Sequence, residues 1–283
     1  MFKQSLMMAC VAVALVSAPA APAIAQSGDG MRQVEIERLL VIDTNQGRIL
    51  VEMNPDIAQG HVQRIRLLAG EGFYDGVKWH RVIDGFMAQT GDPTGTGEGN
   101  SSYDNLKAEL TFRRGEGSSF VAAAAPAGSL AGFMDTVPVI TQPDIYMSRS
   151  GDGAVHAWGS YCAGVAGMAR DDDEDSANSQ FFLMREAYPS LDKRYSIWGR
   201  VVDGQDVVNS LKVGPLPGGA VENADVMLRV RAGDQLPLNE RPVVRVRDTR
   251  SSQFAAELAQ VRNQRGADFS VCDVPFKVEV SAP

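Results

Sequence analysis

The chain has little of the chemistry that many enzymes need. Its 283 residues include three cysteines and three histidines, and aromatic residues make up only 7%. So few cysteines exclude a disulfide-rich scaffold, and no cysteine or histidine pair has the spacing of a zinc site. The motifs Gly-x-Ser-x-Gly and His-Glu-x-x-His, which mark common hydrolases, are also missing. The sequence therefore predicts neither a metal enzyme nor a hydrolase of these kinds.

Long hydrophobic runs are missing as well, apart from one near the N-terminus. Lys3 precedes an apolar stretch from Leu6 to Val16 that is too short to cross a bilayer, and a small-x-small pattern ends at Ala25. This pattern predicts a secretory signal peptide over residues 1–25, cleaved after Ala25; a buried N-terminal helix is the alternative. No later run reaches the length of a transmembrane helix, so we expect an exported protein without membrane insertion.

Positive charge is in deficit. The sequence has 27 Lys and Arg against 35 Asp and Glu, a net charge of −8, and removal of Lys3 with the signal peptide makes it −9. An acidic chain of this kind lacks the basic surface that nucleic acids require. We therefore expect no nucleic-acid partner.

Two cysteines, Cys162 and Cys272, remain after signal cleavage. An oxidising compartment would allow them to form one disulfide. They lie far apart in the sequence, and buried free thiols are the more common outcome for such cysteines. We therefore expect free thiols, with a single disulfide as the alternative.

Apolar residues recur with strand or helix periods along most of the chain. Runs rich in β-branched residues border the polar turn 44–46, which predicts a β-hairpin. A helical period follows Asp56, the expected cap, and a Gly-Glu-Gly sequence ends it. The predicted elements are strands at 37–43, 47–53, 195–202 and 226–230 and helices at 56–69 and 206–212.

Other segments depart from this pattern. Residues 115–163 are interrupted by Ala, Gly and Pro and lack a sustained period, so we expect a long inserted loop with short local structure. Residues 26–33 are polar and predict a flexible lead-in. Beyond a proline-marked boundary, residues 236–283 predict a C-terminal α/β extension with a strand at 243–246, a helix at 251–264 and a final strand at 269–280.

The residues that could carry chemistry gather in two segments. Residues 79–93 alternate apolar and polar side chains and bring an arginine, a glutamine and two large hydrophobic residues together. Residues 164–182 add a second glutamine and a phenylalanine. The candidate site residues of these two segments are Arg81, Phe86, Met87, Gln89, Gln180 and Phe182.

These segments resemble the two active-site signatures of the cyclophilin-type peptidyl-prolyl cis-trans isomerases of bacteria. The resemblance covers residues 34–213 and is interrupted by the insertion. It implies a mainly β fold: a closed eight-stranded antiparallel β-barrel capped by two helices, over residues 34–235. The inserted loop and the C-terminal α/β extension would be additions to this barrel.

Isomerisation of an X-Pro bond needs no nucleophile, metal or cofactor. The barrier of about 18–20 kcal/mol comes from amide resonance, and a donor aimed at the prolyl nitrogen favours the twisted amide. The resemblance implies that Arg81 is this donor. It also implies substrate-binding roles for Phe86, Met87, Phe182 and Leu191 in the proline pocket, for Gln89 and Gln180 beside the substrate backbone, and for Ala169, Arg170 and Tyr195 along the peptide.

The sequence departs from the family pattern at several positions. Ser190 stands where many members carry an aromatic residue, which implies weak binding of cyclosporin. The acidic run 171–175 lies beside the expected groove. This run could form a solvated turn, favour basic substrates or bind a cation weakly. The insertion either gates the groove or covers another surface.

The expected partners are unfolded or folding exported polypeptides with X-Pro bonds, whose unaided isomerisation is slow. The signal peptide and the bacterial form of the motifs imply a periplasmic or secreted protein. The main alternative is a prolyl-peptide-binding chaperone with little isomerase activity. A third interpretation is an envelope scaffold that docks through its C-terminal tail.

Overall fold

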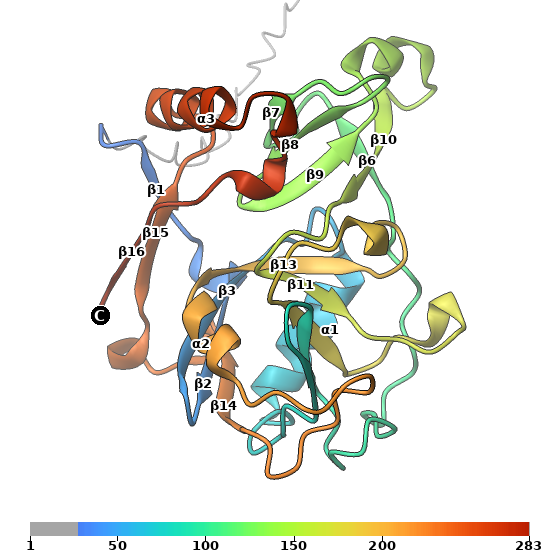
Figure 1. Ribbon diagram of the computed structural model, residues 1–283, viewed down its shortest axis with the longest axis vertical. Coiled ribbons are helices and arrows are strands. Elements are labelled where there is room, and N and C mark those ends of the chain that lie inside the picture. Colours follow the sequence, from blue (N-terminus) through green and yellow to red (C-terminus); the bar gives the residue numbers. More distant parts are fainter. Residues whose placement is uncertain (1–27, 283) are drawn as a thin grey trace, which may run out of the picture.

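The computed structural model describes residues 28–282, so the predicted signal peptide lies outside the described residues. Three antiparallel sheets and three α-helices make up this part of the chain (Figure 1). No helix of the described part is long and apolar enough to cross a membrane.

The largest sheet has eight antiparallel strands in the order β14-β2-β3-β13-β11-β12-β5-β4. The predicted hairpin is confirmed, because β2 and β3 pair from Leu39 opposite Glu52 to Thr44 opposite Gly47. The strands of this sheet are β2 Leu39–Thr44, β3 Gly47–Met53, β4 Arg81–Ile83, β5 Met87–Thr90, β11 Val165–Met168, β12 Phe181–Met184, β13 Ile197–Asp203 and β14 Met227–Ala232.

The sheet curls into a half-barrel, and the prediction of a closed barrel was wrong. Strands β14 and β4 are its two edges, and no ladder joins them within residues 28–282. Edge strand β4 has only three residues, and the segment before β14 contributes only single bridges, Lys78 to Val226 and Arg81 to Ala220. Two isolated bridges are too few to continue the ladder around the barrel.

Two helices lie against this sheet, although their predicted arrangement as caps of a barrel is not confirmed. Helix α1, Gln59–Gly70, packs against β13 and β14 and buries a stripe of apolar side chains that includes Val62, Ile65 and Leu68. It begins after Ala58, so the predicted cap at Asp56 was wrong. Helix α2, Gln205–Ser210, packs against β3.

Four aromatic rings fix strand β12 in the core. The ring of Phe181 meets Tyr74 and Trp198 edge-on at 5.5 Å and Trp79 at 6.1 Å. Successive side chains of a strand point to opposite faces, so the buried ring of Phe181 directs the neighbouring Phe182 to the other face. This placement turns Phe182 toward the site described below.

The insertion is a five-stranded antiparallel sheet, so the prediction of an inserted loop was wrong. Its order is β6-β10-β9-β8-β7, and a two-residue turn with Asp135 at φ 54° joins β8 to β9. Strands β7, β8 and β10 are rich in alanine and glycine and carry too few β-branched residues to show a strand period. The strands are β6 Phe112–Gly115, β7 Phe120–Ala124, β8 Leu130–Met134, β9 Val137–Thr141 and β10 Ala154–Gly159.

Both ends of the described chain meet in the third sheet, which has the order β1-β15-β16. Its strands are β1 Met31–Gln33, β15 Val243–Arg247 and β16 Val278–Ser281. The expected flexible lead-in was therefore wrong at β1. The predicted final strand was also too long, because Val271–Asp273 forms a 3-10 turn and only β16 is extended.

Helix α3, Ser252–Arg265, confirms the predicted helix of the extension. The Ser251 hydroxyl caps it by accepting the backbone N–H of Phe254 at 3.1 Å. The ring of Phe133 in β8 meets Phe254 at 5.7 Å and Phe276 at 5.2 Å, both edge-on. The insertion and the C-terminal segment therefore share one core, and they lie together at one end of the molecule (Figure 1).

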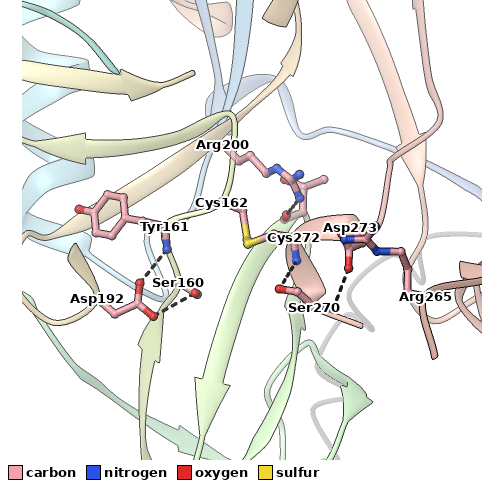
Figure 2. The surroundings of a disulfide bond; sticks show 10 residues. Ser160, Tyr161, Cys162, Asp192, Arg200, Arg265, Ser270, Cys272 and Asp273 are labelled. Atoms are coloured by element: carbon pink, nitrogen blue, oxygen red, sulfur yellow. Dashed lines mark hydrogen bonds and ion pairs between the residues drawn. A yellow bond between two sulfur atoms is a disulfide. The ribbon is translucent and has the colours of Figure 1, made fainter. Parts of the chain in front are cut away.

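A disulfide joins Cys162 to Cys272, with the two Cα atoms 5.0 Å apart, so the expectation of free thiols was wrong. Cys162 lies between β10 and β11, and Cys272 lies in the 3-10 turn of the extension. Figure 2 shows Tyr161 beside this bond, with its backbone N–H on Asp192. The disulfide therefore ties the C-terminal extension to the point where the insertion returns to the half-barrel.

Candidate active site

Nine of the ten predicted site residues line one cavity of about 160 Å³ on the half-barrel. The tenth, Gln180, lies beside it and lines a neighbouring cavity. Strands β4, β5 and β12, the turn between β4 and β5, and two further loops supply the walls. The nine residues are Arg81, Phe86, Met87, Gln89, Ala169, Arg170, Phe182, Leu191 and Tyr195.

Strand register places the polar and apolar groups in one row. Arg81 in β4 pairs with Gln89 in β5, and Gln89 pairs with Phe182 in β12. Directly opposed residues of an antiparallel pair have neighbouring side chains. Three residues from separate strands therefore meet at the cavity, although 101 positions separate Arg81 from Phe182.

Hydrogen bonds hold Arg81 on two sides. Its Nη1 donates to Gln89 Oε1 at 3.1 Å, and its Nε donates to the carbonyl of Gly218 at 3.0 Å. Gln89 Nε2 in turn donates to Gln180 Oε1 at 2.9 Å. Within residues 28–282, Arg81 Nη2 donates no hydrogen bond and no carboxylate pairs with the guanidinium. Burial lowers the pKa of Arg81, yet an arginine stays charged. Nη2 is therefore an uncommitted donor at the cavity: a charged N–H group without a hydrogen-bond partner among the described residues.

Aromatic rings form the floor of the cavity. Phe182 stacks on Tyr161 at 5.7 Å and meets Tyr195 edge-on at 5.6 Å. The buried hydroxyl of Tyr161 donates to the carbonyl of Tyr195 at 3.1 Å. Arg170 lies over the Tyr195 ring at 4.9 Å, and its Nε donates to the carbonyl of Arg194 at 3.0 Å. The guanidinium of Arg170 therefore packs at the rim rather than pointing free into the cavity.

A second cavity of about 200 Å³ adjoins the first and shares Gln89, Ala169 and Arg170 with it. The acidic loop contributes Asp171 to this cavity. Asp175 of the same loop points elsewhere and pairs with Lys107 at 2.6 Å, and that hydrogen bond lowers the pKa of Asp175. No group of three or more metal-binding side chains occurs in the described part of the chain.

A buried carboxylate that sequence reasoning missed organises the loop whose residues Gly97 and Glu98 line this second cavity. Asp92 accepts backbone N–H groups from Thr94 at 2.7 Å and Gly97 at 2.6 Å. Although burial raises its pKa, these hydrogen bonds and that of the Thr94 hydroxyl outweigh burial and lower the pKa. The loop then presents the carbonyls of Gly97 and Gly99 to Gln180 Nε2, each at 2.9 Å. An aspartate before a Thr- and Gly-rich run is a turn signal that could have revealed it.

A curled antiparallel sheet that carries an uncommitted arginine beside an apolar pocket and two amides defines a class of peptide-binding enzyme. The family model "Cyclophilin type peptidyl-prolyl cis-trans isomerase/CLD" matches residues 39–232, more than half of the chain. The chain therefore belongs to the cyclophilin-type peptidyl-prolyl cis-trans isomerases.

Individual relatives agree with this assignment. A protein of Brucella suis biovar 1, named a "probable peptidyl-prolyl cis-trans isomerase", is 34% identical over 194 residues, which are 68% of this chain and 81% of the relative. Peptidyl-prolyl cis-trans isomerase B of Bacillus subtilis is 28% identical over 184 residues, 65% of this chain and 90% of that protein.

Among solved structures, the cyclophilin AquaCyp293 of Hirschia baltica is similar with a TM-score of 0.82 and 32% identity. The match covers 92% of this chain and 96% of that chain. Coverage of this extent reaches beyond the residues that the family model matches. The similarity of fold therefore includes parts of the insertion and of the terminal additions.

Proposed function

We propose that this enzyme accelerates the isomerisation of X-Pro bonds in exported proteins while they fold, with Arg81 as the group that stabilises the twisted amide. The observation that carries the proposal is the uncommitted donor of Arg81 at the edge of an apolar cavity. Twisting the amide localises the lone pair on the prolyl nitrogen. A fixed cationic donor therefore lowers the energy of the transition state more than that of either planar isomer.

The cavity suits a pyrrolidine ring. Its walls carry the side chains of Phe86, Met87, Phe182 and Leu191. Burial of the three ring methylenes contributes roughly 2 kcal/mol to binding at about 0.8 kcal/mol each. The Gln89 side chain lies between Arg81 and Gln180 and orients the guanidinium through its hydrogen bond. The side-chain amides of Gln89 and Gln180 border the path of the substrate backbone. No cofactor enters this reaction.

Two independent features support substrates outside the cytoplasm. The N-terminal sequence has the pattern of a cleavable signal peptide. Disulfides such as Cys162–Cys272 persist in oxidising compartments and are rare in the cytosol. We therefore place the enzyme in the periplasm or among secreted proteins, where unfolded chains with X-Pro bonds would be its substrates.

An Arg81→Ala variant tests the role of the guanidinium in a prolyl-peptide isomerisation assay. We expect kcat/KM to fall by about 100- to 1000-fold, as for loss of one preorganised donor. Arg81→Lys keeps the charge without the planar fork and should recover only part of the activity. Arg48→Ala is the matched control, because Arg48 is an exposed arginine on β3 that pairs with Asp43 far from the cavity.

Equal rates for the wild type and Arg81→Ala would refute the catalytic role. Peptide binding without any acceleration would instead favour the prolyl-peptide-binding chaperone. Truncation after Gly233 tests the scaffold interpretation, but the extension shares a core with the insertion, so we expect that truncated protein to lose stability. We also propose weak cyclosporin binding, because Ser190 offers no aromatic surface; inhibition at nanomolar concentration would contradict this.

A further inference from the structure

An exposed tyrosine continues the apolar wall of the pocket. The ring of Tyr188 lies 4.8 Å from that of Phe86, tilted by 56°, and 47% of the residue is exposed. Phe86 itself lines the cavity, whereas Tyr188 lies outside it. The two rings, called here the Phe86–Tyr188 surface, therefore extend the aromatic wall from the cavity to the solvent-facing rim.

The backbone of this surface is held rigidly. The N–H of Tyr188 donates to the carbonyl of the buried Tyr161 at 2.7 Å, and the N–H of Leu191 donates to the carbonyl of Tyr188 at 3.0 Å. On the other side, the N–H of Arg185 donates to the carbonyl of Phe86 at 2.9 Å. A ring on a fixed backbone loses little conformational entropy when a ligand packs on it. The exposed ring is therefore preorganised for binding.

The Phe86–Tyr188 surface lies at the opposite end of the cavity from Gln180. Gln180 directly precedes β12, and the backbone of Arg185, which bonds Phe86, directly follows it. From Gln180 to Arg185 there are five residue steps, and at about 3.3 Å each they separate these ends by roughly 16 Å. A peptide whose proline lies in the cavity would therefore extend from the side-chain amide of Gln180 at one end to the ring of Tyr188 at the other.

We propose that the Phe86–Tyr188 surface is a subsite for a large apolar side chain next to the substrate proline, on the side away from Gln180. Tyr188 is then a specificity-determining residue, because it supplies the exposed half of the contact. Aromatic rings pair with other rings in edge-on or offset contacts and bury apolar area against aliphatic side chains. The proposal rests on the isomerase function proposed above.

The test uses two series of tetrapeptides, Ala-Xaa-Pro-Ala and Ala-Ala-Pro-Xaa, with Ala, Lys, Leu or Phe as Xaa. The wild type should prefer Leu and Phe over Ala in one series only, the one whose variable residue lies on the side of the proline that faces the Phe86–Tyr188 surface. Tyr188→Ala should lower kcat/KM for those two peptides by about three- to ten-fold, the size of an aromatic contact, and change the Ala peptides by less than about two-fold. Tyr188→Phe should keep the preference, because the ring makes the contact.

Tyr146→Ala is the matched control. Tyr146 is 44% exposed, similar to Tyr188, but it lies in the insertion and outside the cavity. This variant should leave every peptide unchanged. An equal loss for all peptides in Tyr188→Ala would assign the residue a merely structural role and overturn the proposal, as would the absence of any change.

Binding measurements separate this proposal from the isomerase function. Calorimetric titration compares the Phe and Ala peptides on the wild type and on Tyr188→Ala, without any need for turnover. A Phe preference that Tyr188→Ala abolishes supports the subsite even if the wild type proves inactive. Equal affinity for both peptides on the wild type overturns the subsite even if isomerase activity is high.

Discussion

Removal of the disulfide provides a quantitative test of how the C-terminal extension is attached. The bond closes a loop of 110 residues between Cys162 and Cys272. In the chain-entropy model, a loop of this length restricts the unfolded state by about 4.8 kcal/mol at 25 °C, and measured disulfide contributions are typically about 2–4 kcal/mol. We therefore expect a Cys162→Ala/Cys272→Ala double variant to lose about 2–5 kcal/mol of unfolding free energy.

Urea denaturation followed by far-UV circular dichroism measures this loss, with the wild type in reductant as an independent route to the same state. The reductant should destabilise the wild type and leave the double variant unchanged. A double variant within about 0.5 kcal/mol of the wild type would refute the reasoning, because ordinary surface substitutions already span that range. It would mean that the shared core alone holds the extension in place.

Isomerase activity should respond much less than stability. Tyr161, which stacks under Phe182 in the pocket, is anchored by its backbone N–H to Asp192 Oδ1 at 2.9 Å, and the Ser160 hydroxyl donates to Asp192 Oδ2 at 2.9 Å (Figure 2). These contacts do not involve the disulfide. We expect kcat/KM of the folded double variant at 25 °C to stay within a factor of about two. A larger loss would show that the bond itself positions the pocket floor.

Three other changes test the core shared by the insertion and the C-terminal segment, Asp135 in the turn between β8 and β9, and the Asp92 loop beside the pocket. Phe133→Ala removes a fully buried ring of the shared core and should cost about 3–5 kcal/mol in urea denaturation; a loss below about 1 kcal/mol would contradict the packing. Burial, and to a lesser extent the negative charge of Glu52, raise the pKa of Asp135. The contribution of Asp135 to stability is therefore full below its unfolded pKa and is lost as pH rises through its folded pKa. Asp135→Asn should therefore gain in Tm relative to the wild type as the pH rises from 4 to 8, and a constant difference would refute this. The pKa of Asp92 is lowered, so its contribution is present above the unfolded pKa near 4 and is lost as pH falls below it; Asp92→Asn should destabilise the protein at pH 7 and flatten its acid unfolding curve, and an unchanged curve would contradict this.

Much of the half-barrel follows from local pattern. The hairpin of β2 and β3, helix α1 and helix α3 carry regular apolar periods and turn signals, and they appear close to the predicted residues. The candidate site residues could also be predicted from the sequence, because two short signatures contain most of them. The structure places nine of the ten around one cavity, yet Leu191 and Tyr195 come from a loop without a distinctive local pattern.

The failures share a physical cause. The insertion was predicted as a loop because its alanine- and glycine-rich strands depend on pairing with each other and on burial against Phe254 and Phe276 for stability. The closed barrel was expected, although β4, with only three residues, reaches the segment before β14 through isolated bridges and forms no ladder with β14. Tyr188 was missed because only the packed strands place it beside Phe86. Asp92 was missed although its local turn signal was present in the sequence.

The sequence alone therefore determined the family signatures, the local elements and the residues available for chemistry, since these depend on neighbours within a few positions. Only the tertiary structure decided that Cys162 meets Cys272 and that β1 joins the C-terminal strand β15. It also decided that Tyr188 extends the pocket wall. Such contacts join residues that are distant in the sequence or that lie on separate loops, and they form only when the whole chain packs into a common core.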